Sequence, residues 1–443
     1  MLIRFRVGNF SSFREPVEFS MVPTREKAHR DLHLYKSHSV KERDLLRAAV
    51  IYGANASGKS NFIKAFSFAE RFITKGVRPQ RAIGANAFKL DQDCKDRPSS
   101  FYFEIQMENK MFSYEFSITN EAVISESLSE LTKTKTKLLF TRSFDSDENR
   151  FEFGGFLGKL SKEDKQKLVF VSEGTRKNQL FVTESIERNL DFFKPVYDWF
   201  SKCIRVFTPQ SIGHGVEFRL GNDEEFKEFL TEVLSEFDPS VVGIESQLVG
   251  AEAALDFPPR LFEDLNDELD NGVAVFVADV VKGNRSVVLK KDGELKLLKI
   301  FTQHESIDNG EKVTFDLEEE SDGTRRLIEL APLFFELLRS EEVVIAFIDE
   351  LDRSLHPLLT RRLLDIFLRH RKGHMAQIVI STHNSVLLDV DLLRRDEIWF
   401  IDKGDGSSKL KSLQRDFNPR YDKDIRKDYL YGSYGGIPRI RNS

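Results

Sequence analysis

The sequence has little cysteine, no long apolar run and no excess of positive charge, and each absence excludes a class of protein. Its two cysteines, Cys94 and Cys203, lie far apart and outside any Cys-x-x-Cys or Cys/His spacing, which argues against a disulfide framework or a zinc site. No apolar run approaches the roughly 20 residues that a membrane-spanning helix needs. The 66 basic and 72 acidic side chains give a formal net charge of −6, so no global positive field requires a nucleic-acid or membrane partner. We therefore expect a cytoplasmic protein without a membrane partner, in which any DNA contact depends on a local patch.

The 443 residues are about three times the length of an average domain, and the sequence pattern changes along them. Alternating strand patterns dominate the first part, helical stripes of apolar residues follow, and the last third alternates apolar helices with β-branched strands. The last pattern is typical of a parallel α/β sheet. We predict an N-terminal lobe over 1–134, a mainly helical insert over 135–270 that ends in an acidic linker at 263–271, and a C-terminal lobe over 271–443.

Residues 53–60, GANASGKS, fit the pattern GxxxxGK[ST] and lie between a predicted strand and a predicted helix. In such a loop the backbone N–H groups cradle phosphates, and the positive end of the helix dipole favours the same charge. Lys59 would reach the β- and γ-phosphates, and Ser60 would offer a ligand to Mg²⁺. We predict a nucleotide site formed by Gly53, Asn55, Ser57, Gly58, Lys59, Ser60 and Asn61.

Two adjacent carboxylates, Asp349 and Glu350, end the apolar run 343–348 in the form of a Walker B strand. A buried parallel strand delivers such residues to the crevice at the carboxyl edge of its sheet. Asp349 would then hold the Mg²⁺ shell, and Glu350 would orient or deprotonate the attacking water. His383 ends the next predicted strand, where an imidazole could contact a γ-phosphate. Each motif alone is equally typical of an acidic turn or a polar strand end, and the P-loop favours the functional interpretation.

Together with the turn 321–325, SDGTR, these motifs resemble the ABC-type ATPase heads of the SMC, RecF and OLD proteins in order and spacing. The resemblance implies an α/β P-loop NTPase fold of ABC/SMC-head type, with a β-rich N-terminal lobe, a mostly parallel C-terminal sheet and a mainly helical insert. It also implies an ATPase that uses ATP and Mg²⁺, with Glu350, His383 and Lys59 as catalytic residues. The signature residues Ser321 and Gly323 would complete the phosphate site of the opposite subunit, in a homodimer or higher homo-oligomer.

A narrower resemblance rests on NFSSF, ESDGTRR, DELDRSLHP, STHNSVLLD and the tail YLYGSYGGIP. This combination is similar to AAA-type ATPases of bacterial anti-phage and abortive-infection operons, including the ATPase partners of the PARIS and Septu systems. OLD nucleases carry a Toprim domain after the ATPase head, and the 60 residues that follow His383 show no such pattern. The resemblance therefore implies a separate effector, a nuclease, that the ATPase regulates in response to phage.

Several positions depart from the family pattern or leave alternatives open. Asp322 and Thr324 stand where the ABC family commonly has Gly and Gln, and His356 stands where SMC heads carry Asp. Gln106 fits either a Q-loop or a solvent-facing strand position. Two basic clusters leave direct DNA binding by a RecF-like repair or clamp ATPase as the alternative function, although solvated faces explain them as well: Lys133, Lys135 and Lys137, and Arg369, Arg371 and Lys372. A nucleotide-regulated scaffold with negligible turnover is a third hypothesis.

Overall fold

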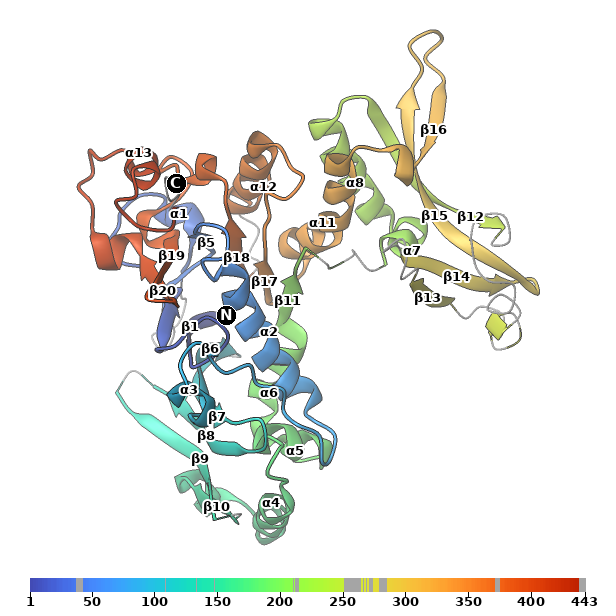
Figure 1. Cartoon of the computed structure of the whole chain (residues 1–443). Helices are drawn as coiled ribbons and strands as arrows, with labels where there is room; N and C mark the ends of the chain where they lie inside the picture. Colours follow the sequence, from blue (N-terminus) through green and yellow to red (C-terminus); the bar gives the residue numbers. More distant parts are fainter. Residues whose placement is uncertain are drawn as a thin grey trace. The chain divides into compact units, whose positions relative to one another are not determined.

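The structure is a computed structural model of the chain. It describes residues 1–36, 43–107, 109–132, 134–146, 148–209, 211, 215–250, 264–265, 267, 269–270, 274–278, 285–370 and 375–437. Part of the predicted linker and Lys133, Arg371 and Lys372 of the basic clusters lie outside these residues. Over the described ranges the chain divides into two compact units, whose elements are labelled in Figure 1. The first comprises Met1–Pro209, Leu337–Asp352 and Thr360–Ser443, and the second comprises Gln210–Glu336 and Arg353–Leu359.

An antiparallel sheet forms one layer of the first unit, with neighbouring strands in the order β10-β9-β8-β7-β6-β1-β2. Alternate residues of β1 face the core: Phe5 and Val7 are fully buried, whereas Arg4 and Arg6, which alternate with them, are partly exposed. Phe5 lies opposite Phe103 in the register. The strands are β1 (Leu2–Gly8), β2 (Val17–Ser20), β6 (Ser99–Met107), β7 (Lys110–Ile118), β8 (Val123–Leu131), β9 (Thr136–Asp145) and β10 (Glu148–Phe153).

A mostly parallel sheet forms the other layer of this unit, in the order β11-β17-β18-β5-β19-β20, with only its last pair antiparallel. Every residue of β5, β17 and β18 is buried, as expected for a parallel sheet that is covered on both faces. The strands are β11 (Ile204–Phe207), β17 (Val344–Ile348), β18 (Ala376–Thr382), β5 (Ala48–Tyr52), β19 (Ile398–Gly404) and β20 (Ser407–Ser412). Because parallel strands end at the same edge, the residues that follow β5, β17 and β18 come together.

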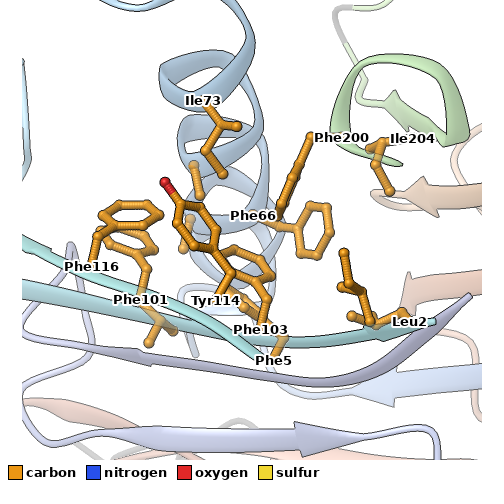
Figure 2. Close-up of a cluster of buried hydrophobic side chains, with 14 of the residues drawn as sticks. Leu2, Phe5, Phe66, Ile73, Phe101, Phe103, Tyr114, Phe116, Phe200 and Ile204 are labelled. Atoms are coloured by element: carbon orange, nitrogen blue, oxygen red, sulfur yellow. The ribbon is translucent and has the colours of Figure 1, made fainter. Parts of the chain in front are cut away.

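Helix α2 (Lys59–Lys75) packs against both sheets through an aromatic cluster (Figure 2). The ring of Phe66 stacks on Phe347 of the parallel sheet at 3.9 Å between centroids and meets Phe5 and Phe103 of the antiparallel sheet edge-on at 5.1 and 5.6 Å. Much of the phenylalanine of this chain therefore fills the core between the two layers. This packing fixes the helix that begins with Lys59.

Short elements complete the first unit. The strands β3 (Leu34–Tyr35) and β4 (Leu45–Leu46) pair with each other. The α-helices are α1 (Arg30–His33), α3 (Asp93–Asp96), α4 (Lys162–Gly174), α5 (Phe181–Glu187), α6 (Lys194–Cys203) and α13 (Ile425–Leu430), and α12 (Pro357–Arg369) begins in the second unit and continues in the first. Single turns occur at η1 (Gly155–Lys159), η2 (Asp191–Phe193), η4 (Ser385–Leu387), η5 (Arg395–Glu397) and η6 (Leu413–Phe417).

The second unit combines an antiparallel sheet with three helices in its described part. Strand order is β12-β15-β14-β13, and β16 also pairs with β15. Phe335 packs edge-on against Phe226 and Phe229 at 5.4 Å each, so the apolar stripes of the two longer helices meet. The elements are α7 (Val216–Asn222), α8 (Glu224–Phe237), β12 (Val241–Gly250), β13 (Ala274–Ala278), β14 (Arg285–Lys291), β15 (Glu294–Glu305), β16 (Lys312–Asp316), η3 (Leu317–Glu319) and α11 (Asp322–Arg339), which ends in the first unit.

The α/β class, the β-rich N-terminal lobe and the mostly parallel C-terminal sheet are confirmed. The predicted boundaries at 134 and 270 differ from the structural division, and the mainly helical insert is not one body. Residues 136–153 form β9 and β10, which extend the N-terminal sheet, and residues 210–270 belong with 271–336. The strand signal is weak there because β10 is an edge strand in which no residue is fully buried.

Candidate functional site

The glycine loop lies between β5 and α2. Ser12, near the start of the sequence, and Ser408, near its end, both lie against it. Gly58 adopts a φ of 118°, and a Cβ there would lie 2.8 Å from the Ser12 hydroxyl and would clash with that of Ser408. The Ser408 hydroxyl donates to the Ser57 carbonyl at 2.5 Å, and the Ser408 N–H donates to the Ser12 carbonyl at 2.8 Å. Only glycine fits this position, because both the conformation and the space exclude a side chain.

Lys59, the first residue of α2, is 4% exposed and directs its ammonium back into the loop. Its Nζ donates to the carbonyls of Gly53 and Ala54 at 2.8 and 3.1 Å, and lies 3.3 Å from Nδ1 of His383. Burial lowers the pKa of Lys59 to about 8, although nearby carboxylates, Asp349 first, oppose the shift. The loop therefore holds a desolvated cation beside its own carbonyls.

Asp349 and Glu350 follow β17 and point differently because the backbone turns sharply between them. Asp349 is 3% exposed, whereas the Glu350 side chain is 36% exposed, and Glu350 has a left-handed φ of 52°. Ser381 of β18 stabilises the turn: its hydroxyl donates to Asp349 Oδ1 at 2.5 Å and accepts from the Glu350 N–H at 2.9 Å. A non-glycine residue in this region is strained, and such strain clusters at functional sites.

His383 directly follows β18 and connects the lysine with the second carboxylate. Its Nε2 lies 4.0 Å from Glu350 Oε1, and its backbone N–H donates to Asp352 Oδ2 at 3.2 Å. Burial, and next the Lys59 cation, lower the pKa of His383 below its ordinary value. The imidazole is therefore neutral at pH 7 and can donate from one nitrogen while it accepts at the other.

Two hydroxyls beside the loop, those of Ser12 and Ser57, are buried and have no hydrogen-bond partner within the part of the chain that the structure describes. Ser12 also lines a pocket of about 370 Å³, to whose lining Asn61, Asn86 and Lys403 contribute. Unpaired buried hydroxyls are costly unless a ligand or water satisfies them. The residues thus suit a phosphate at the loop and a nucleoside in the pocket.

The side chains near the loop also suit a magnesium ion. The hydroxyl of Ser60 and the carboxylate of Asp349 are the hard oxygen donors that Mg²⁺ prefers. Over the described residues there is no cluster of three or more His, Cys, Asp or Glu side chains that would hold a metal by itself. A Mg²⁺ ion here would therefore take its other ligands from phosphate and water.

The signature residues Ser321 and Gly323 lie in the second unit, whereas the residues above lie in the first. The Ser321 hydroxyl caps α11 by accepting from the Thr324 N–H at 3.1 Å. A Cβ on Gly323 would lie 3.3 Å from the Ser354 carbonyl, so a small residue is required there. This helix start is therefore ordered and exposes a positive dipole end.

The structure brings Lys59, Asp349, Glu350 and His383 together at the carboxyl edge of the parallel sheet, where the sequence placed them. Of the remaining loop residues, Ser57 is buried, Asn55 is exposed and Asn61 lines the pocket. Sequence reasoning missed the supporting roles of Ser12, Ser381 and Ser408. Ser12, in NFSSF, and Ser381, the first residue of STHNSVLLD, belonged to noted patterns but were assigned no role, and Ser408 belonged to none.

Gln106 is 5% exposed at the end of β6, where its backbone pairs with Met1. The interpretation of Gln106 as a solvent-facing strand residue is therefore wrong. The reason is that β1 and the N-terminal residue cover this end of β6, which the sequence of β6 alone does not reveal.

A glycine loop between a strand and a helix, with paired carboxylates at the end of a second parallel strand of the same sheet, defines a P-loop NTPase fold. Residues 48–389 match the model of the family described as "AAA domain, putative AbiEii toxin, Type IV TA system", and the chain belongs to this family.

Solved structures with similarity to this chain include SMC heads. The SMC head domain from Thermotoga maritima matches with 14% identity and a TM-score of 0.36, over 93% of this chain and 98% of that one. An Smc head with an extended coiled coil, bound to the C-terminal domain of ScpA derived from Pyrococcus furiosus, matches with 13% identity and a TM-score of 0.39, over 93% and 96% of the two chains. No curated protein matches the chain. No helix in the described ranges is long and apolar enough to cross a membrane.

Proposed function

We propose that this protein binds ATP with Mg²⁺ at the P-loop and hydrolyses it to ADP and phosphate. One observation carries the proposal: His383 contacts both Lys59 and Glu350 beside a glycine loop, next to which the hydroxyls of Ser12 and Ser57 are buried and unpaired within the described residues. Lys59 would exchange the carbonyls of Gly53 and Ala54 for phosphate oxygens, which are stronger partners for a cation. Ser60 and Asp349 would hold the Mg²⁺ ion, which when bound neutralises charge on the β- and γ-phosphates.

Glu350 is the residue best placed to act on water. Its exposed carboxylate would accept a proton as the water oxygen bonds to the γ-phosphorus and the bond to the β-phosphate oxygen breaks. His383, neutral at pH 7, would donate from Nε2 to the γ-phosphate while Nδ1 accepts from Lys59. The left-handed turn at Glu350 fixes the direction of its side chain relative to Asp349.

The proposal extends to assembly and biological role. Ser321 and Gly323 begin a helix whose N-terminus favours an anion, which supports a role in completing the phosphate site of a second subunit. ATP would then join subunits as a homodimer or higher oligomer. The family description names a "putative AbiEii toxin" of a type IV toxin–antitoxin system. The proposed role in anti-phage defence beside a separate effector, such as the nuclease of PARIS- or Septu-like systems, rests on the resemblance of the sequence motifs alone.

The test compares wild type with Glu350→Gln by light scattering and phosphate release, with and without Mg²⁺ and ATP. We expect the variant to bind ATP and accumulate an assembly heavier than the 51.2 kDa monomer, with phosphate release reduced at least a hundredfold. Glu341→Gln, an exposed position before β17, is the matched control. Wild-type turnover by Glu350→Gln would remove Glu350 from the mechanism. If Ser321→Ala assembled and hydrolysed ATP like wild type, the signature would have no role in a second subunit's site.

DNA binding is the competing function. The basic clusters, as far as the structure describes them, give it little support. Lys137 lies 3.7 Å from Glu130, and Arg369 pairs with Asp365 at 2.6 Å, so part of the charge is neutralised locally. Salt-sensitive DNA binding that ATP strengthens would nevertheless favour a RecF-like ATPase over a regulator of an effector.

A further inference from the structure

The C-terminal tail, residues 425–437, is anchored beneath the P-loop by aromatic stacking. Tyr429 and Tyr434 are both 6% exposed and stack on Phe400 of β19, at 5.4 and 5.2 Å between centroids. Tyr429 also meets the ring of Tyr52 edge-on at 6.0 Å, and Tyr52 is the last residue before the loop. The tail therefore packs on the same two strands that fix the start of the P-loop.

The glycine turn that ends this tail touches the P-loop backbone itself. Gly436 is buried with a φ of 70°, and a Cβ there would lie 3.3 Å from Gly53 Cα and 3.4 Å from the Ile401 carbonyl oxygen. A Cβ on Gly53 would lie 2.6 Å from the same carbonyl oxygen. The Tyr429 hydroxyl donates to the Gly436 carbonyl at 3.0 Å. Gly53 leaves no room for a side chain. A Cβ at Gly436 would strain the left-handed backbone and press on the neighbouring backbone by a few tenths of an ångström.

Gly53 links this contact to Lys59, the lysine proposed to bind phosphate. Its carbonyl accepts from Lys59 Nζ, the group that would leave it for phosphate when nucleotide binds. Movement at Gly53 would therefore alter both the loop path and the position of Lys59. Hydrogen bonds weaken steeply when donor and acceptor are misaligned, so a displaced loop would hold phosphate less tightly.

We infer that Gly436, held by Tyr429, is a positioning residue for the P-loop, and that nucleotide binding and packing of the tail are coupled. The inference rests on the proposed nucleotide binding and adds a regulatory contact to it. Coupling of this kind is reciprocal: whatever holds the tail in place strengthens nucleotide binding, and nucleotide in turn protects the tail. A partner that draws the tail away would weaken ATP binding without touching the site.

The experiment compares the full chain with Gly436→Ala and the matched control Gly432→Ala. Gly432 has a similar φ of 82°, but a Cβ there would meet only the flexible end of the Ile437 side chain. Both variants strain the same turn, and only Gly436→Ala presses on Gly53. We expect Gly436→Ala to raise the Kd for Mg·ATP about tenfold, with kcat at saturation near wild type, and Gly432→Ala to change Kd less than about twofold.

Two further measurements separate positioning from a loss of folding. Tyr429→Phe retains the ring and removes the hydrogen bond to Gly436, and should raise the Kd about threefold at unchanged Tm. Hydrogen exchange at residues 432–437 should slow when wild type is saturated with Mg·ATP. Equal losses from both glycine variants, or unchanged exchange with nucleotide, would overturn the inference while leaving the proposed function intact. Absence of nucleotide binding by wild type would overturn the proposed function itself, and the coupling with it.

Discussion

The buried ammonium of Lys59 gives the free energy of unfolding a specific pH dependence in the absence of nucleotide. The pKa of Lys59 is about 8 in the folded chain, against 10.5 for a freely exposed lysine. Folding therefore disfavours the protonated form of Lys59. The full free-energy cost of burying its charge is present below about pH 8. As the pH rises above about 8, Lys59 loses its proton in the folded state while it keeps it in the unfolded state. Because the unfolded state then binds more protons, the free energy of unfolding increases with pH until Lys59 is deprotonated in both states, above about pH 10.5.

The magnitude follows from the difference between the two pKa values. A gap of roughly 2.5 pKa units corresponds to about 3 kcal/mol, of which about 2 kcal/mol is recovered between about pH 7 and pH 9.5. Lys59 is 4% exposed, so solvent screening reduces this little. Lys59→Met keeps the length and apolar stem of the side chain but removes the charge.

The assay is urea unfolding of wild type and Lys59→Met without nucleotide, at several pH values. All other titrating groups are shared, so they cancel in the difference between the two free energies of unfolding. We expect wild type to gain about 2 kcal/mol relative to Lys59→Met between about pH 7 and pH 9.5. Lys64→Met, at an exposed position of the same helix, controls for the loss of a lysine. A difference that stays constant across this range would refute the assignment of Lys59 as a buried, strained cation.

Two further predictions concern the support of the site. Ser381→Ala removes the hydroxyl that joins Asp349 and Glu350, so we expect kcat for ATP to fall about a hundredfold with the KM changed less than threefold. Steady-state phosphate release measures both constants. A wild-type kcat would show that the turn at Glu350 keeps its geometry without the serine. Phe66→Ala opens a cavity between the two sheets and should lower the free energy of unfolding by about 3–5 kcal/mol. Urea unfolding measures this loss. A loss below about 1 kcal/mol would contradict the central place of this ring in the core.

The motifs of the site could be recognised from local sequence patterns because each motif is contiguous in the chain. The glycine loop 53–60, the Asp349–Glu350 pair and His383 are each set by a strand end and its next few residues, so the alternation of apolar strands and helices was enough to locate them. The same reasoning predicted that parallel strands would deliver these groups to one edge.

The supporting roles of Ser381 and Ser408 could not be predicted because they arise from contacts between strands that are separate in the sequence. Ser381 is an ordinary strand residue until β17 and β18 pair, and Ser408 acts on the loop only because β20 closes the sheet. The boundaries of the predicted insert failed for a related reason, since β9 and β10 are defined by pairing with β8 rather than by their own apolar pattern.

The sequence by itself therefore determined the class of fold and was enough to propose which residues contact phosphate, metal and water, because strand, loop and helix signals are local. Only the tertiary structure decided the buried state of Lys59, the strained turn at Glu350 and the contact of Gly436 with Gly53. These depend on desolvation and on close approach between segments that are separated in the sequence, by 31 residues for Ser381 and Glu350 and by 324 for Lys59 and His383, which no local pattern encodes.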